Sequence, residues 1–269
     1  MISTKIIKNF TREKSVPVPD IDHIADFGFR TLDDVSGGLY IDDFVVLAGP
    51  TGAGTGTFGS NVVLNVALQN VHVLAFMSRT STEDLVKNIL DDMAYRKRGK
   101  TFEDLQIDSN AVGLILQQIS GLPLHIVEAD AGEKINGFPF SKAEGIIRDY
   151  VIGHHSAVIY IESLRAMGWG ADEILKLQKL FDDLILKVDD NVAFATIAGG
   201  EIKSSGEENG RLVNEDALEK VGAKAIVFKS KHGSAPLTVT VNEFVLGTDR
   251  LNKFHLRISP TGSTFEEIS

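Results

Sequence analysis

Short apolar runs alternate with amphipathic stretches along most of the chain. The runs 44–48 and 157–161 are almost wholly apolar, which is typical of strands buried on both faces of a sheet. Over 171–188 the apolar residues recur at helical spacing, which predicts a long amphipathic helix. Its apolar stripe consists of Ile174, Leu177, Phe181, Leu184 and Val188. Repeated strand–helix alternation predicts an α/β fold with a mainly parallel central sheet and helices on both faces.

The same patterns place the remaining elements. Further helices are expected at about 58–69, from Ser81 onward, at 110–119, 141–152 and 215–221. Further strands are expected at 72–77, 124–127, 192–198, 225–229, 237–246 and 254–258, the last two forming a C-terminal antiparallel extension. Residues 199–210 are expected to form a polar, glycine-rich loop. Residues 1–25 are expected to form an extended arm, and residues 26–269 a single domain.

Composition restricts the classes of protein and site. The chain has 269 residues, of which 43% are hydrophobic and 24% charged, as in globular proteins. It has no cysteine, which excludes disulfides and thiolate chemistry, and its seven histidines show no metal-ligand spacing. No apolar run approaches the roughly 20 residues of a membrane span, and the N-terminal residues lack a signal-peptide core. These features favour a cytoplasmic protein that binds no metal and no membrane.

The net charge of −10 disfavours binding of nucleic acid across the whole surface. One compact basic segment, YRKRGK at 95–100, is the exception. Its cations are expected either to complement the C-terminal end of a helix dipole or to contact nucleic acid. In the second case, neutralising Arg96, Lys97 and Arg98 would abolish salt-dependent binding.

A glycine-rich segment follows the first apolar run. It consists of Gly49, Pro50, Thr51, Gly52, Ala53, Gly54, Thr55, Gly56 and Thr57. Two glycines five positions apart, between a strand and a helix, match the outline of a phosphate-binding loop. In that motif a lysine and a serine or threonine come next and reach the phosphates and Mg²⁺, whereas here Thr55 and Gly56 stand in their places. The segment predicts a weak or vestigial phosphate loop, with a purely structural glycine turn as the alternative.

The order of motifs over about 28–267 resembles the RecA-type ATPase core, in particular the C-terminal motor domain of DnaB-type replicative helicases. The stretches that carry the resemblance are Thr31–Asp34 with Gly37–Leu39, Val73–Phe76 with Ser81–Leu85, Ile161–Met167, and Glu173–Ala198. The resemblance implies a RecA-like fold and places the catalytic positions of the family on this chain. It also implies assembly side by side with similar domains.

Most of these positions hold residues unsuited to catalysis. The resemblance places Thr55 at the P-loop lysine, Gly56 at the Mg²⁺-binding hydroxyl, Arg79 at the catalytic glutamate and Gly199 at the sensor glutamine. Glu162 stands at the Walker B aspartate and keeps its charge. We interpret Glu162 either as the remnant of a metal ligand or as a buried acid paired with Arg79 or another cation, with a solvent-facing Arg79 as the alternative.

Two further positions have open interpretations. Arg250 matches the family's trans-acting arginine and is expected to be either a finger that reaches a neighbour's site or an ordinary surface arginine. Trp169, between two glycines, is expected to anchor a loop or to mark an interface.

These losses predict a catalytically inactive protein. Loss of a transition-state cation alone slows phosphoryl transfer by about 10³–10⁵-fold. The sequence therefore predicts a RecA/DnaB-like structural or regulatory subunit in DNA replication or recombination. Its expected partners are copies of itself or an active RecA- or DnaB-type ATPase, and no cofactor is expected, although weak binding of ATP with Mg²⁺ stays open.

The sequence leaves two alternative functions open. The chain could be an active DNA-dependent ATPase or helicase whose lysine comes from elsewhere, with Lys203, Lys229 and Lys231 as candidates. It could also be a DNA-binding accessory protein without ATPase activity, although its acidity argues against this.

Overall fold

The computed structural model describes residues 22–49, 52–105, 109–154, 156–188, 193–201, 212–230, 238–245, 248–259 and 261–268. Most of the predicted arm, and Pro50 and Thr51 of the glycine loop, lie outside this part. So do Lys203 and Lys231, and the side chains of Lys229 and Arg250.

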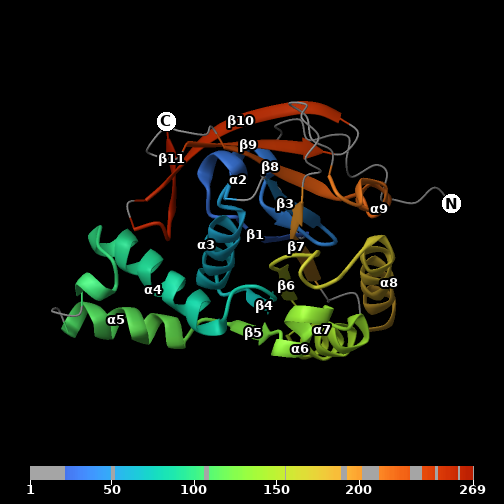
Figure 1. Ribbon diagram of the computed structural model, residues 1–269, viewed down its shortest axis with the longest axis horizontal. Coiled ribbons are helices and arrows are strands. Elements are labelled where there is room, and N and C mark those ends of the chain that lie inside the picture. The colour runs from blue at the N-terminus through green and yellow to red at the C-terminus, as the bar shows by residue number, and fades with distance from the viewer. Residues whose placement is uncertain are drawn as a thin grey trace.

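A nine-stranded sheet forms the centre of the fold, with its strands in the order β11-β10-β9-β8-β3-β7-β6-β4-β5 (Figure 1). Six neighbouring strands are parallel: β3 (Phe44–Gly49), β4 (His72–Met77), β5 (Leu124–Glu128), β6 (Ser156–Ile161), β7 (Ala193–Glu201) and β8 (Lys224–Ser230). Three antiparallel strands extend the sheet: β9 (Thr238–Val245), β10 (Thr248–Ile258) and β11 (Phe265–Ile268). The predicted mainly parallel sheet and its C-terminal antiparallel extension are confirmed.

Helices cover both faces of the sheet (Figure 1). One face carries α3 (Thr55–Leu68), α4 (Thr82–Arg98) and α5 (Ser109–Ser120), whose apolar residues join one core cluster. The opposite face carries α7 (Phe140–His154), α8 (Ala171–Val188) and α9 (Glu215–Lys220), which join a second cluster. The short elements are β1 (His23–Ala25), α2 (Arg30–Ser36), β2 (Leu39–Tyr40), the 3₁₀ turn η1 (Glu103–Leu105) and α6 (Ala131–Asn136).

Strand β3 shows why the buried strands are apolar at every position. Val45 and Leu47 point into the core cluster with α3, whereas Phe44 and Val46 point into the cluster with α7 and α8. Successive side chains of a strand face opposite sides of the sheet, so both sets must be apolar when helices cover both sides.

The boundaries differ from the sequence predictions at two places near the glycine loop. Helix α3 begins at Thr55, three residues before the predicted start. Strand β7 continues to Glu201, so the predicted loop at 199–210 begins later than expected. The extra residues pair with β3 in parallel register, with Gly49 opposite Glu201. The strand places Glu201 beside the loop instead of leaving it in a separate polar segment.

Two smaller predictions are confirmed. Ser81 caps α4 by accepting a hydrogen bond from the backbone N–H of Asp84 at 3.1 Å. Trp169 anchors a loop, because its side chain is buried and its Nε1–H donates to the carbonyl of Phe138 at 2.8 Å.

A buried polar network attaches β11 and the turn before it to α3 and α4. The carboxylate of Asp92 accepts from Nε and Nη2 of Arg96 at 2.6 and 2.8 Å, from Nδ2 of Asn61 at 2.9 Å and from Oγ1 of Thr264 at 2.7 Å. Asn61 also accepts from the backbone N–H of Phe265 at 2.8 Å. Only 1% of Asp92 is exposed. Every one of these polar groups therefore has a partner inside the fold, as burial requires.

Asp33 in the first turn of α2 responds to pH. Its carboxylate accepts hydrogen bonds from the backbone N–H groups of Phe27 at 2.7 Å and Gly28 at 3.0 Å. Burial, with a smaller contribution from the charge of Asp26, raises the pKa of Asp33 from 3.8 to about 6 and outweighs the opposite effect of the backbone hydrogen bonds.

We therefore expect Asp33 to stabilise the fold more at acidic than at neutral pH. A raised pKa means that the folded state holds a proton that the unfolded chain has released, so the contribution is complete below about pH 4 and is lost as pH rises through about 6. Urea unfolding of wild type and Asp33→Asn, which cannot titrate, would measure this. The urea midpoint of the wild type should fall relative to that of Asp33→Asn as the pH rises from about 4 to about 7. A constant difference would contradict the assignment.

Candidate functional site

The described part of the glycine loop joins a buried strand to a helix. It leaves the sheet at Gly49, and α3 begins at Thr55. Gly54 lies at the N-cap of α3 with φ of 85°, and Gly52 has φ of 84°, values that favour glycine. No side chain caps the helix. The predicted strand–loop–helix arrangement is therefore present in the described part of the segment.

Two of the loop glycines also have packing roles. A Cβ on Gly54 would lie 2.7 Å from Cζ of Phe265, whose ring rests on the first turn of α3. A Cβ on Gly49 would lie 2.9 Å from Cβ of Phe228. By contrast, a Cβ on Gly52 or Gly56 would meet no atom within 4 Å. Packing thus explains two of the glycines and leaves the others facing open space.

Glu162 follows β6 and holds the loop after the neighbouring strand β4. Its Oε2 accepts hydrogen bonds from the backbone N–H groups of Ser78 at 2.7 Å, Arg79 at 2.6 Å and Thr80 at 3.2 Å. The hydroxyls of Ser78, at 3.4 Å, and Thr80 also donate to this carboxylate. Five donors therefore converge on a group with about four acceptor positions.

A metal ion does not fit this arrangement, because Mg²⁺ would need a free carboxylate oxygen at Glu162. Among the described residues, no group of three or more His, Asp or Glu side chains could hold a metal. Glu162 as described therefore has no free oxygen for a metal, and its interpretation as the remnant of a metal ligand stays a prediction. The alternative, an ion pair with the Arg79 side chain, is wrong, since Arg79 contacts Glu162 through its backbone N–H.

The guanidinium of Arg79 contacts Glu201 instead. Its Nη2 lies 3.4 Å from Oε1 of Glu201, and Nη1 of Arg165 lies 2.9 Å from Oε2 of the same carboxylate. Glu201 ends β7, Arg165 follows β6 and Arg79 follows β4, so all three lie at the carboxyl edge of adjacent strands. Ligands of open α/β sheets bind at this edge.

Gly199, at the position of the sensor glutamine, leaves no room for a side chain. A Cβ there would lie 2.0 Å from the carbonyl oxygen of Glu162. The carbonyl of Gly199 accepts a hydrogen bond from the N–H of Leu164 at 2.9 Å, which ties the two segments together. A sensor side chain at this position would require the chain after β6 to move.

Arg250 lies in β10, and its side chain is outside the described part of the structure. Its role as a trans finger stays a prediction. The same holds for a lysine supplied by Lys203, Lys229 or Lys231, because none of these side chains is described.

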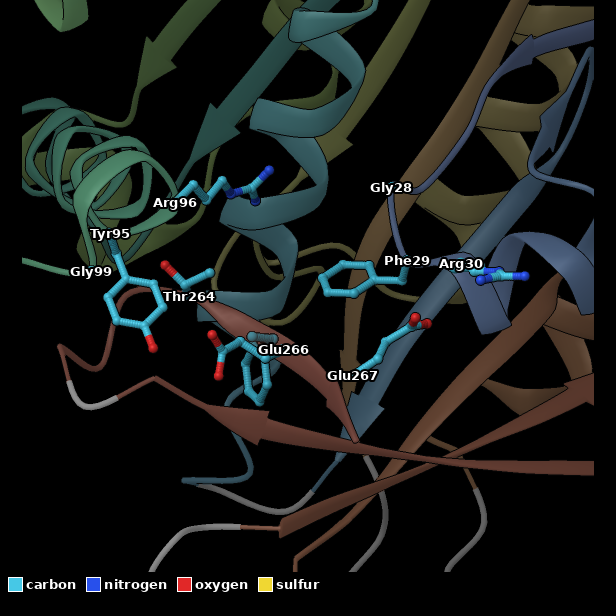
Figure 2. Close-up of a pocket in the computed structure, with 10 residues that line it drawn as sticks. Gly28, Phe29, Arg30, Tyr95, Arg96, Gly99, Thr264, Glu266 and Glu267 are labelled. Atoms are coloured by element: carbon cyan, nitrogen blue, oxygen red, sulfur yellow. The ribbon is translucent and has the colours of Figure 1, made fainter. Parts of the chain in front are cut away.

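A groove of about 560 Å³ lies away from these residues, between the end of α4, residues 28–30 and β11. Figure 2 shows Tyr95 and Arg96 at one side, Phe29 and Arg30 at the other, and Glu266 and Glu267 between them.

The basic segment at the end of α4 borders this groove but suits nucleic acid poorly. Arg96 is held by the buried Asp92, and Nζ of Lys97 lies 2.7 Å from Oε1 of Gln118. Glu266 and Glu267 would repel phosphates. Neutralising Arg96 would also break its ion pair with the buried Asp92, so a loss of DNA binding in that variant could result from damage to the fold.

Comparison with solved structures shows that this architecture is a RecA-like fold. The ATPase domain of another protein superposes with a TM-score of 0.68 at 13% identity, covering 93% of this chain and 94% of that one. A KaiC-like protein from the hyperthermophilic archaeon Pyrococcus horikoshii superposes with a TM-score of 0.57 at 18% identity, covering 94% and 100%.

The chain therefore has a RecA-like core that resembles the ATPase domain of DnaB-type helicases. No protein-family model matches the sequence, and no curated protein matches it. No helix in the described part of the chain is long and apolar enough to cross a membrane.

Sequence reasoning missed four residues of the site: Ser78, Thr80, Arg165 and Glu201. Ser78 and Thr80 flank Arg79, and Arg165 stands three residues after Glu162. Glu201 could have been found by extending the apolar strand pattern by three residues, since the glycines at 199 and 200 hid the continuation of β7.

Proposed function

We propose that this protein is a catalytically inactive RecA/DnaB-like domain that acts as a structural or regulatory subunit in DNA replication or recombination. Its partners would be copies of itself or an active RecA- or DnaB-type ATPase. The observation that supports the proposal best is the engagement of Glu162. A carboxylate that must hold Mg²⁺ in a working site here serves as the acceptor for three backbone N–H groups and two hydroxyls.

The other positions support the same conclusion. Thr55 supplies no charge to phosphates, and Gly199 has no space for a water-orienting side chain. Arg79 is paired with Glu201 and has no carboxylate with which to activate water. Phosphoryl transfer depends on positioned charges, so their combined loss removes hydrolysis and leaves the folded scaffold.

Calorimetric titration with ATP and Mg²⁺, with phosphate release measured on the same sample with and without single-stranded DNA, tests the proposal. We expect no phosphate release in either condition. DNA-stimulated turnover would overturn the proposal and revive a motor ATPase with groups supplied from elsewhere. A parallel copurification with RecA- and DnaB-type ATPases, and a sedimentation measurement of the free protein, would identify the partner.

Restoring the phosphate-loop residues should not restore hydrolysis. In the double variant Thr55→Lys, Gly56→Thr the new ammonium group could gain a charged hydrogen bond to a phosphate, which is expected to improve ATP affinity about 10-fold or more. Phosphate release should stay at background, because Glu162 remains occupied and Gly199 remains without a side chain. Thr55→Ala is the matched control for the change at the helix start. Multiple turnovers by the double variant would show that the loop alone was limiting.

A further inference from the structure

Two arginines share one carboxylate at the carboxyl edge beside the glycine loop. Arg79 and Arg165 converge on Glu201. Glu162, by contrast, accepts its hydrogen bonds from backbone N–H groups and hydroxyls of the loop at 78–80. The side chains of Arg79 and Arg165 are 58% and 75% exposed. Exposed ion pairs stabilise a fold by only about 0–1 kcal/mol, so stability gives little reason to hold two guanidinium groups together.

The acidic groups around these arginines are already satisfied. Glu162, the nearest carboxylate toward β4, is surrounded by hydrogen-bond donors of the loop at 78–80 and requires no cation. Glu201 accepts one hydrogen bond from each guanidinium and keeps both groups at the same place. Each guanidinium has five N–H donors, and within the described part of the structure Arg79 and Arg165 each give one of them to Glu201, which leaves most of their donors for a ligand.

The glycine loop borders the same place. Gly49 lies directly opposite Glu201 in the paired strands β3 and β7. The space beside Gly52 is open, because a Cβ there would meet no atom within 4 Å. A small anion held by the arginines would therefore have Gly49 and Gly52, two residues without side chains, on this side.

We propose that Arg79 and Arg165 form a metal-independent binding site for a small phosphate-bearing anion at the carboxyl edge of β4, β6 and β7. Planar guanidinium groups bind phosphate oxygens in pairs, and Glu201 orients both groups before the ligand arrives. The two arginines supply the positive charge that a lysine and Mg²⁺ supply in a working nucleotide site. The inference rests on the proposed function in one respect, since both assume that the protein no longer holds Mg²⁺ at Glu162.

Titration calorimetry with inorganic pyrophosphate, in the presence of EDTA, tests the site directly. We expect binding without metal, weakened about 10-fold or more in Arg79→Ala and in Arg165→Ala, because each loses a charged hydrogen bond. Arg165→Lys keeps the charge without the planar fork and should fall between wild type and Arg165→Ala. Binding should weaken as salt is raised.

Arg148→Ala is the matched control. It removes the same charge from an exposed ion pair with Glu144 on α7, a helix that contributes none of the edge residues, and should leave affinity unchanged. Urea midpoints of all variants establish that each is folded. Absence of binding in EDTA, binding only with Mg²⁺, or equal affinity in the arginine variants and wild type would each overturn the site. ATP turnover would overturn the proposed function instead, so the two failures are distinguishable.

Discussion

Asp92→Ala is expected to lower the free energy of unfolding by about 3–5 kcal/mol, because it removes one partner of a buried ion pair. Asp92 is 1% exposed, and its carboxylate satisfies Arg96, Asn61 and Thr264 together. Alanine would leave the guanidinium without its counter-ion and the hydroxyl of Thr264 without its acceptor, and Nδ2 of Asn61 would keep only the carbonyl of Ser263 as an acceptor. The cost comes mainly from these unpaired groups and less from the lost contacts.

Urea unfolding followed by fluorescence of Trp169 would measure the loss. Hydrogen exchange adds a second readout, since the backbone N–H of Phe265, which donates to Asn61, should lose protection early. Asp34→Ala is the control: Asp34 is exposed and pairs with Arg30 only at 3.8 Å, so its removal should change stability by less than about 0.5 kcal/mol. A similar small effect at Asp92 would mean that the network contributes little.

Glu162→Ala is expected to destabilise the protein by about 2–4 kcal/mol, because it strands backbone donors of the loop at 78–80. Glu162→Gln keeps an acceptor oxygen and should lose less. The change in the free energy of unfolding distinguishes two roles of Glu162, support of the loop at 78–80 and metal binding. A carboxylate kept for metal binding strains a site, and its removal commonly leaves stability unchanged or raises it.

Chemical denaturation without added metal provides the measurement. Glu144→Ala, which breaks an exposed i,i+4 pair with Arg148, is the matched control and should lie within about 0.5 kcal/mol of wild type. If Glu162→Ala were as stable as wild type, the hydrogen bonds to the loop would not explain why the carboxylate is present.

The main elements of the fold could be predicted from the sequence, because burial on both faces leaves a strong pattern. Strands β3 and β6 are apolar at nearly every position, and α8 shows its stripe at Ile174, Leu177 and Phe181. The elements that were missed are short or polar. Strand β11 has two glutamates among its four residues, and α6 is a six-residue helix with a capping box formed by Asp130 and Glu133.

The candidate site was predictable in position and less so in its contacts. The resemblance singled out Glu162 and Arg79, and the structure has them after the neighbouring strands β6 and β4, at the carboxyl edge of the sheet. It did not show that Glu162 receives backbone N–H groups or that Arg79 turns to Glu201. Those contacts join residues 83 and 122 positions apart, and no local pattern records such a pairing.

The attachment of β11 to α3 has a consequence for how the chain folds. Asn61 is paired with the carbonyl of Ser263 and the N–H of Phe265, residues 202 and 204 positions away. Contacts of such long sequence separation form late, because the loop between them must first be closed. Until then Asn61 keeps only its hydrogen bond to Asp92 of α4, and its remaining polar groups must stay hydrated. During synthesis, the first helix after the glycine loop therefore completes its packing only after nearly all of the sheet has been made.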